Sequence, residues 1–120
     1  MSQSTAPTWQ TKDQFEFAAK AAGYTKTAWV EDASGVERFQ VYSDREMWLE
    51  WNPRDDDRDA YCLGIDLHLT TSSGHKTCAV QADNSRFWLY EEIDNHNGDS
   101  RAAMRYAIFR AAVQLGKFMS

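Results

Sequence analysis

The chain has 120 residues and a formal net charge of −5, and 42% of its residues are hydrophobic and 13% aromatic. This length fits one domain, and the hydrophobic content is sufficient for a core. The negative charge argues against a general nucleic-acid-binding protein, because phosphate binding requires a basic face.

Residues 1–10 are polar and predict a flexible tail that carries neither a signal peptide nor an apolar segment. Thr11 is typical of a helix N-cap, and Gln14 stands where the second member of a capping box is expected. Apolar residues then recur at helical spacing up to Gly23, which favours a helix end. The sequence therefore predicts a short first helix.

Three stretches with strand character follow. Residues 28–30 are apolar, 36–43 alternate between apolar and polar, and 47–51 alternate again. A turn is expected at 32–35. Pro53 ends the third stretch, because proline has no amide hydrogen for a sheet ladder.

Residues 60–69 are compatible with two structures. Tyr61 and the apolar residues after it alternate with a period of two, which favours a strand. The three aspartates at 55–57 are instead typical of a helix start, where negative charge is favourable. Gly64 weakens both interpretations, so the local sequence leaves helix and strand equally open.

The next segment predicts a loop and a hairpin. Residues 71–74 are small and polar and predict a plain loop. Residues 76–82 and 86–93 predict two strands joined by a turn at 83–85. Large side chains on both faces of the second strand indicate a sheet that is covered on both sides.

Residues 98–120 predict a long helix, with Asp99 and Ser100 as candidate N-caps. Its apolar residues form two strips, and such a helix is either mostly buried or carries a partner surface. The second strip and its basic flanks consist of Ala102, Phe109, Val113, Arg105 and Arg110. If no other helix covers this strip, we expect it to contact a partner.

Side chains that could carry chemistry form no recognisable constellation. Four aspartates approach the spacing of a calcium-binding loop (Asp55, Asp57, Asp59 and Asp66), but Ala60 stands where that loop requires glycine. The histidines are scattered, and no phosphate-binding loop or nucleophile motif is present. We therefore expect no metal, no cofactor and no enzymatic activity.

Aromatic side chains support an alternative function. Trp48, Trp51 and Trp88, together with Tyr90, have rings on which a nucleotide could stack. Packing in a core or an interface accounts for the same rings without a ligand. A small-molecule or nucleotide binder with a tryptophan-lined surface remains the alternative.

The sequence also bears on the cellular compartment. Cys62 and Cys78 are too few for a disulfide framework, and no stretch approaches the roughly 20 apolar residues that a membrane span needs. We expect a cytoplasmic protein.

Three parts of the chain carry a resemblance to a known family. They are Trp-Asn-Pro-Arg-Asp-Asp-Asp-Arg-Asp-Ala at 51–60, the opening segment 11–23, and the C-terminal segment 105–119. Together they are similar to the small phage and prophage proteins with a phage ABA sandwich domain. The resemblance extends over nearly the whole chain, and the first of the three parts is the most specific.

The resemblance implies a helix at 56–69 and an α+β fold. It implies one domain at 11–120, an α/β/α sandwich in which helices cover both faces of a small, mostly antiparallel sheet. The implied function is that of an accessory protein in the bacterial cytoplasm, which binds a host or phage protein and inhibits, for example, a host defence factor. A second copy of the chain is an alternative partner.

We expect two sets of residues to matter most. The candidate binding surface comprises Arg105, Phe109, Arg110, Val113, Trp48, Trp88 and Tyr90. The expected core includes Phe15, Phe39, Val41, Leu49, Val80, Leu89, Ile108 and Leu115.

Overall fold

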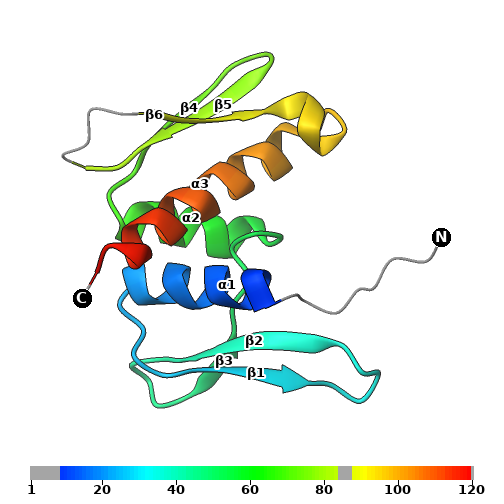
Figure 1. The fold of residues 1–120 in the computed structure, drawn as a ribbon, viewed down its shortest axis with the longest axis vertical. Coiled ribbons are helices and arrows are strands. Elements are labelled where there is room, and N and C mark those ends of the chain that lie inside the picture. The colour runs from blue at the N-terminus through cyan, green and yellow to red at the C-terminus, as the bar shows by residue number, and fades with distance from the viewer. Residues whose placement is uncertain (1–8, 84–87, 120) are drawn as a thin grey trace.

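The computed structural model describes residues 9–83 and 88–119. It has three layers: two three-stranded antiparallel sheets lie on the outside, and three helices lie between them (Figure 1). The overall shape is flat, with extents of 40 × 40 × 23 Å.

The first helix, α1 (Trp9–Ala21), begins before Thr11, so the predicted N-cap role of Thr11 is wrong and the predicted tail is two residues too long. Its predicted end is confirmed. Gly23 has a φ of 96°, which favours glycine, and its amide donates to the Lys20 carbonyl at 3.0 Å. The amide of Tyr24 donates to the Ala19 carbonyl at 3.0 Å, which completes a Schellman motif.

The first sheet contains β1 (Thr27–Glu31), β2 (Glu37–Tyr42) and β3 (Trp48–Glu50) in that order. Phe39 and Val41 of β2 point toward the helices and are buried. Their neighbours Arg38, Gln40 and Tyr42 therefore lie on the outer face, because side chains alternate along a strand.

Large rings fill the space between this sheet and the helices. The ring of Phe15 on α1 lies 5.3 Å from that of Trp29, 5.5 Å from that of Phe39 and 5.0 Å from that of Phe109. Aromatic pairs at these distances and tilted orientations are favourable beyond their buried area. Phe15 thus joins α1, the first sheet and the C-terminal helix.

Residues 57–66 are helical, which confirms the helix prediction in this region. Helix α2 (Asp57–Asp66) begins at Asp56, whose side chain accepts a hydrogen bond from the Asp59 amide at 2.9 Å. The helix is shorter than the predicted 56–69, because Leu67 forms its C-cap and His68 takes a positive φ of 55°.

The second sheet contains β4 (Thr70–Ser73), β5 (Thr77–Gln81) and β6 (Trp88–Glu92) in that order. The predicted hairpin of β5 and β6 is confirmed by their antiparallel pairing, although part of its turn lies outside the described residues. The predicted loop at 71–74 is wrong. Gly74 donates to the Thr77 carbonyl at 2.9 Å and closes a hairpin, so the polar segment before it pairs with β5 as β4.

The chain then makes a 3₁₀ turn, η1 (Ile93–His96), and enters α3 (Ser100–Lys117). The side chain of Asp99 accepts from the amides of Arg101 and Ala102 at 3.0 and 3.1 Å, which confirms one of the two predicted N-caps. Helix α3 crosses the middle of the molecule (Figure 1).

The fold class is confirmed: the chain is an α+β single domain with antiparallel strands. The order of layers differs from the predicted sandwich, because the strands form two sheets outside the helices and not one sheet between them. The outer faces are therefore open, and Tyr90 of β6 is 61% exposed. The large side chains on both faces of β6 therefore do not indicate a sheet that is covered on both sides, and that prediction is wrong.

Most of the expected core is confirmed. Phe15, Phe39, Val41, Val80 and Ile108 are buried, and Leu89 and Leu115 are half-buried. The prediction that Leu49 is buried is wrong, because Leu49 lies on the short edge strand β3 and borders an open surface cavity.

Candidate functional site

The predicted tryptophan surface does not exist as one surface. Trp48 pairs with Tyr42 on the outer face of the first sheet, where the two rings lie 5.3 Å apart. Trp88 and Tyr90 lie on the outer face of the second sheet, across the helix layer. Three layers thus separate these rings, so one ligand cannot bind both sets.

The predicted strip on the last helix is part of the core. Phe109 is 1% exposed and Val113 is 5% exposed, and Phe109 packs on Phe15 of α1. These two residues are therefore wrong as contact residues. The condition on which the prediction rested, that no other helix covers the strip, is not met because α1 covers it.

Arg110 belongs to a polar cluster around a buried carboxylate. Glu91 is 7% exposed, its Oε2 lies 2.7 Å from Arg110 Nη1, and its Oε1 lies 2.9 Å from His96 Nε2. The ring of Tyr106 lies 5.4 Å from that of His96 and 5.9 Å from the Arg110 guanidinium carbon. Both carboxylate oxygens are engaged, so the cluster ties β6, η1 and α3 together and offers no open site.

A thiol lies beside this cluster. Burial, with a further contribution from the charge of Glu91, raises the pKa of the Cys78 thiol. The Cys78 sulfur lies 3.6 Å from the Ser100 carbonyl. A buried thiol with a raised pKa is a poor nucleophile, because the thiolate is the reactive form.

The aspartates at the start of α2 are engaged with the protein. Asp59 accepts from the Asn52 amide at 2.9 Å, Asp56 caps the helix, and Asp57 lies 2.6 Å from Arg105. Burial raises the pKa of the Asp59 carboxyl above its ordinary 3.8. Among residues 9–83 and 88–119, no group of three potential metal ligands gathers.

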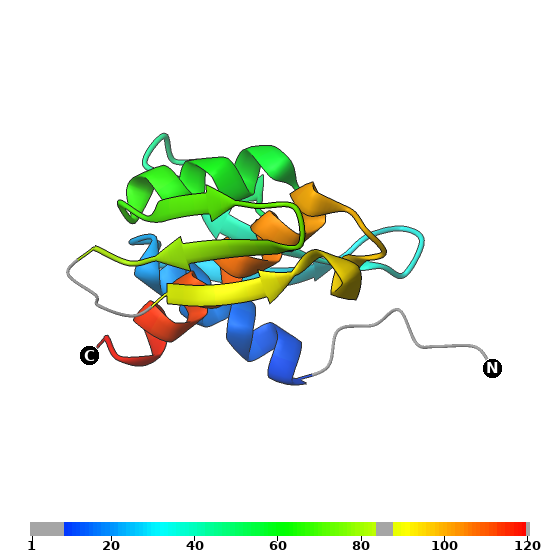
Figure 2. The same cartoon turned by 90° about the horizontal axis from the view of Figure 1, so that it is seen from above.

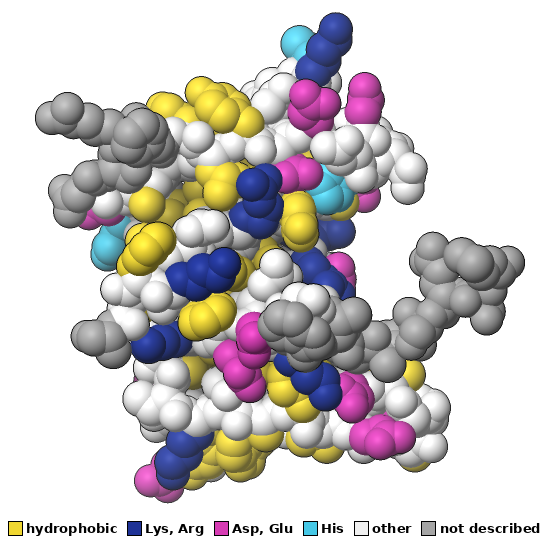
Figure 3. Space-filling view, viewed as in Figure 1, with side chains coloured by type: hydrophobic (Ala, Val, Ile, Leu, Met, Phe, Trp, Pro, Cys, Tyr) yellow, Lys and Arg dark blue, Asp and Glu magenta, His cyan; other side chains and the backbone are white. Residues whose placement is uncertain are grey.

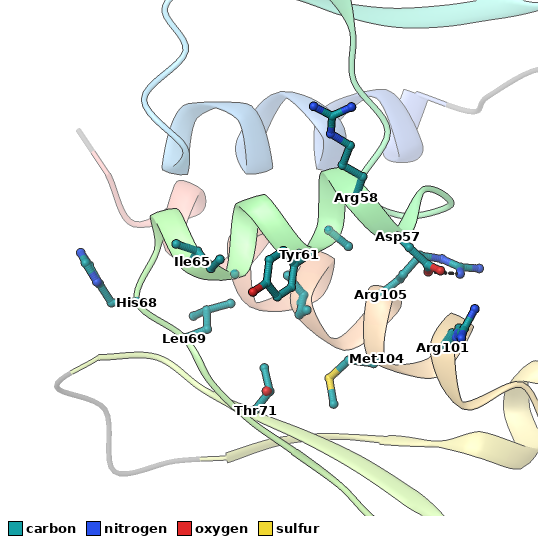
Figure 4. Close-up of a pocket in the computed structure, with 13 residues that line it drawn as sticks. Asp57, Arg58, Tyr61, Ile65, His68, Leu69, Thr71, Arg101, Met104 and Arg105 are labelled. Atoms are coloured by element: carbon teal, nitrogen blue, oxygen red, sulfur yellow. Dashed lines mark hydrogen bonds and ion pairs between the residues drawn. The ribbon is translucent and has the colours of Figure 1, made fainter.

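One surface cavity is a groove between α2, α3 and β4. It has a volume of about 610 Å³, and Figure 4 shows side chains from all three elements around it. Its floor includes Ile108 and Met104 of α3, and Leu69 and Thr71 line the side toward the second sheet. On the α2 side, two of the residues that line the groove, Tyr61 and Ile65, are large, apolar and exposed.

Tyr61 is 69% exposed and Ile65 is 55% exposed. The two side chains are four residues apart, so they lie one above the other on the same face of α2. Leu63 and Gly64 of the same helix are buried. Helix α2 therefore presents a second apolar face, which borders the groove and has no cover among the described residues.

One end of the groove is basic. Arg101 and Arg105 of α3 lie there (Figure 4). Arg105 is paired with Asp57, and its Nε donates to the Arg54 carbonyl at 3.3 Å. Arg101 is exposed and forms no ion pair within the described part of the chain. Arg58 also borders the cavity, but it points away toward α1 in Figure 4.

Other basic side chains lie elsewhere. On the face shown in Figure 3, lysine and arginine side chains follow one another down the middle of the molecule, and hydrophobic side chains gather near the two sheets. The groove differs from that face because its basic groups flank an apolar floor.

The groove exists because the second sheet is narrow. Its strands lie about 4.8 Å apart, whereas packed helices lie about 8–10 Å apart, so three strands cover little more than one helix. Figure 2 shows the sheet over α3, with α2 alongside the free edge of β4. The apolar face of α2 lies where a further strand would cover it.

Of the residues predicted as a binding surface, only Arg105 lies at the groove. Tyr61, Ile65 and Arg101 were missed. The sequence did contain a signal for Tyr61 and Ile65. They are apolar residues spaced four apart, as on one face of a helix, and they are additional to the apolar residues that the core requires. The alternation at 60–69 concealed it, because the same residues also fit a strand.

No helix among the described residues has the length and apolar character to cross a bilayer. No family model, curated protein or solved structure matches this chain.

Proposed function

We propose that this chain is a non-enzymatic binding protein that recognises a partner protein through the groove between α2, α3 and β4. The observation that carries the proposal is the exposure of Tyr61 and Ile65 beside a cavity of about 610 Å³. Exposed apolar side chains that line a concave surface are typical of contact sites.

The chemistry of the groove favours a protein segment over a nucleotide. Its floor is apolar, and of the two arginines at its basic end Arg105 is already paired with Asp57, which leaves Arg101. A nucleotide would need several groups for its phosphates, whereas a protein segment needs apolar anchors and few charges.

A partner in a bacterial host is what the resemblance of the sequence to phage ABA sandwich proteins implies. A host defence factor is the partner class that we propose.

The test compares two variants with matched exposure. Ile65→Asp places a charge in the groove, and Val30→Asp places one on the outer face of the first sheet, where Val30 is 42% exposed. Tagged wild-type and variant proteins are used for capture from bacterial lysate, and any captured protein is purified and its affinity for each protein is measured. A protein that binds the wild type and Val30→Asp but not Ile65→Asp supports the proposal.

The opposite pattern, loss with Val30→Asp alone, would move the contact surface to the first sheet. Thermal melting with a panel of nucleotides provides the second check. A nucleotide that raises the melting temperature of the wild type would favour the alternative function, because a ligand stabilises the state that it binds.

A further inference from the structure

The free edge of β4 borders the groove. The order of the second sheet is β4-β5-β6, so among residues 9–83 and 88–119 β4 pairs on one side only. All four of its side chains, Thr70 to Ser73, are exposed. Edge strands are commonly protected by charged residues, proline or a bulge, and β4 contains no charge and no proline.

The pairing of β4 shows which backbone groups are available. Gly74 and Thr77 form a hydrogen-bonded pair at the hairpin end. Such pairs alternate in an antiparallel ladder, so Ser72 bonds to β5, and the amides and carbonyls of Thr71 and Ser73 point toward the free edge. An extended chain beside β4 could bond to these two residues.

The face of such an added strand would be chemically matched to the groove. The side chain of Thr71 is on the same sheet face as that of its partner Val80, which is buried against the helices. Alternate side chains of an added strand would point the same way, toward Tyr61 and Ile65 of α2.

Resting on the proposed function, we propose that the groove receives an extended segment of the partner protein, which adds to the edge of β4 as a fourth strand of the second sheet. Apolar side chains at alternate positions fill the groove, and an acidic side chain pairs with Arg101 at its basic end. Main-chain hydrogen bonds with pockets for alternate side chains are a recurring mode of segment recognition.

A second copy of this chain does not fit the same site. Two-fold pairing through β4 would bring the α2 of the second copy beneath the joined edge, where the first α2 already lies (Figure 2). A linear segment has no such helix. The overall charge of −5 does not oppose an acidic segment at this point, because Arg101 lies directly at the groove.

The test uses a synthetic probe and the unaltered protein. The probe is a peptide of about seven residues, which is long enough to span β4. Isoleucine or valine occupies the alternate positions that face the groove, glutamate replaces the last of these at the end near Arg101, and threonine occupies the positions that face away. Two further versions carry N-methyl groups on alternate amides, one version on the odd and one on the even positions. Fluorescence anisotropy measures their affinities, and amide hydrogen exchange measures protection along β4.

In strand addition, one set of peptide amides faces β4 and the other faces away. We expect one methylated version to lose affinity about tenfold or more and the other to stay within about threefold, because only the first loses hydrogen bonds to the protein. Bound peptide should slow exchange at the Thr71 and Ser73 amides and leave Ser72 unchanged, since Ser72 already bonds to β5.

Equal effects of the two methylated versions, or no added protection at Thr71 and Ser73, would overturn strand addition. So would failure of the acidic probe to bind, or tighter binding of a version with lysine in place of glutamate. A further outcome separates this inference from the proposed function. If the two methylated versions bind equally well, and Ile65→Asp abolishes binding of the probe while Val30→Asp does not, the groove is still the contact surface. Only the addition of a strand to β4 is then refuted.

Discussion

Gly116 provides the sharpest test of the packing of the helix layer. A Cβ added there would lie 1.9 Å from the carbonyl oxygen of Phe17 on α1 and 2.6 Å from its carbonyl carbon. The obstacle is main chain inside a helix, so it cannot rotate away. Helices α1 and α3 would have to separate by about 1.5 Å to reach ordinary contact distance.

The expected cost follows from two opposing terms. Alanine gains up to about 1 kcal/mol over glycine inside a helix, and less in the last turn, where Gly116 lies. Overpacking of a close contact typically costs about 1–3 kcal/mol. The displacement also loosens the contact of Phe15 with Phe109 between the same helices. We expect Gly116→Ala to reduce the free energy of unfolding by about 1–3 kcal/mol.

Gly64 in α2 is the matched control. A Cβ added there would meet only Ile108, at 3.7 Å, which is an ordinary contact. We expect Gly64→Ala to raise the free energy of unfolding by about 0.5–1 kcal/mol, because the same substitution improves helix propensity without a clash. Urea unfolding followed by circular dichroism measures both variants against wild type. If Gly116→Ala is as stable as Gly64→Ala, the close approach of α1 and α3 is not present in solution.

Three other outcomes are expected. Phe109→Ala should lower the free energy of unfolding by about 3–5 kcal/mol in urea melts, because a buried ring is lost; a change within about 0.5 kcal/mol would show that Phe109 is on the surface. Hydrogen bonds from Ser34 and then Arg38 lower the pKa of Asp32 from its ordinary 3.8, so Asp32 adds stability above that pH and loses it as the pH falls below; Asp32→Asn should therefore be less stable than wild type at neutral pH and approach it in acid, and a pH-independent difference would contradict this. Iodoacetamide should label exposed Cys62 in the folded protein and spare buried Cys78, as mass spectrometry of the digested protein would show; equal labelling would contradict the burial.

The elements that could be predicted from the sequence have local causes. Asp99 and Gly23 specify helix ends through their own backbone and side-chain bonds, and the alternation around Phe39 specifies a strand through its buried face. Strand β4 could not be predicted in this way, because Thr70–Ser73 has no apolar pattern and is held by its pairing with β5.

The groove could not be predicted for a related reason. It depends on where β4 lies relative to α2, and neither Tyr61 nor Thr71 carries that information locally. The burial of the strip at Phe109 could not be predicted either. The strip was identified correctly as apolar, but its cover by α1 depends on a contact between residues far apart in the sequence.

That contact has a consequence for synthesis in the cell. Lys20, at the end of α1, donates to the carbonyl of Met119 at 2.8 Å across 99 residues of sequence. The ribosome releases α1 first and α3 last among the described elements, so the middle layer cannot close until α3 has emerged. Until α3 emerges, Phe15 and the inner faces of both sheets have no complete cover, and this exposed apolar surface makes the incomplete chain prone to aggregation.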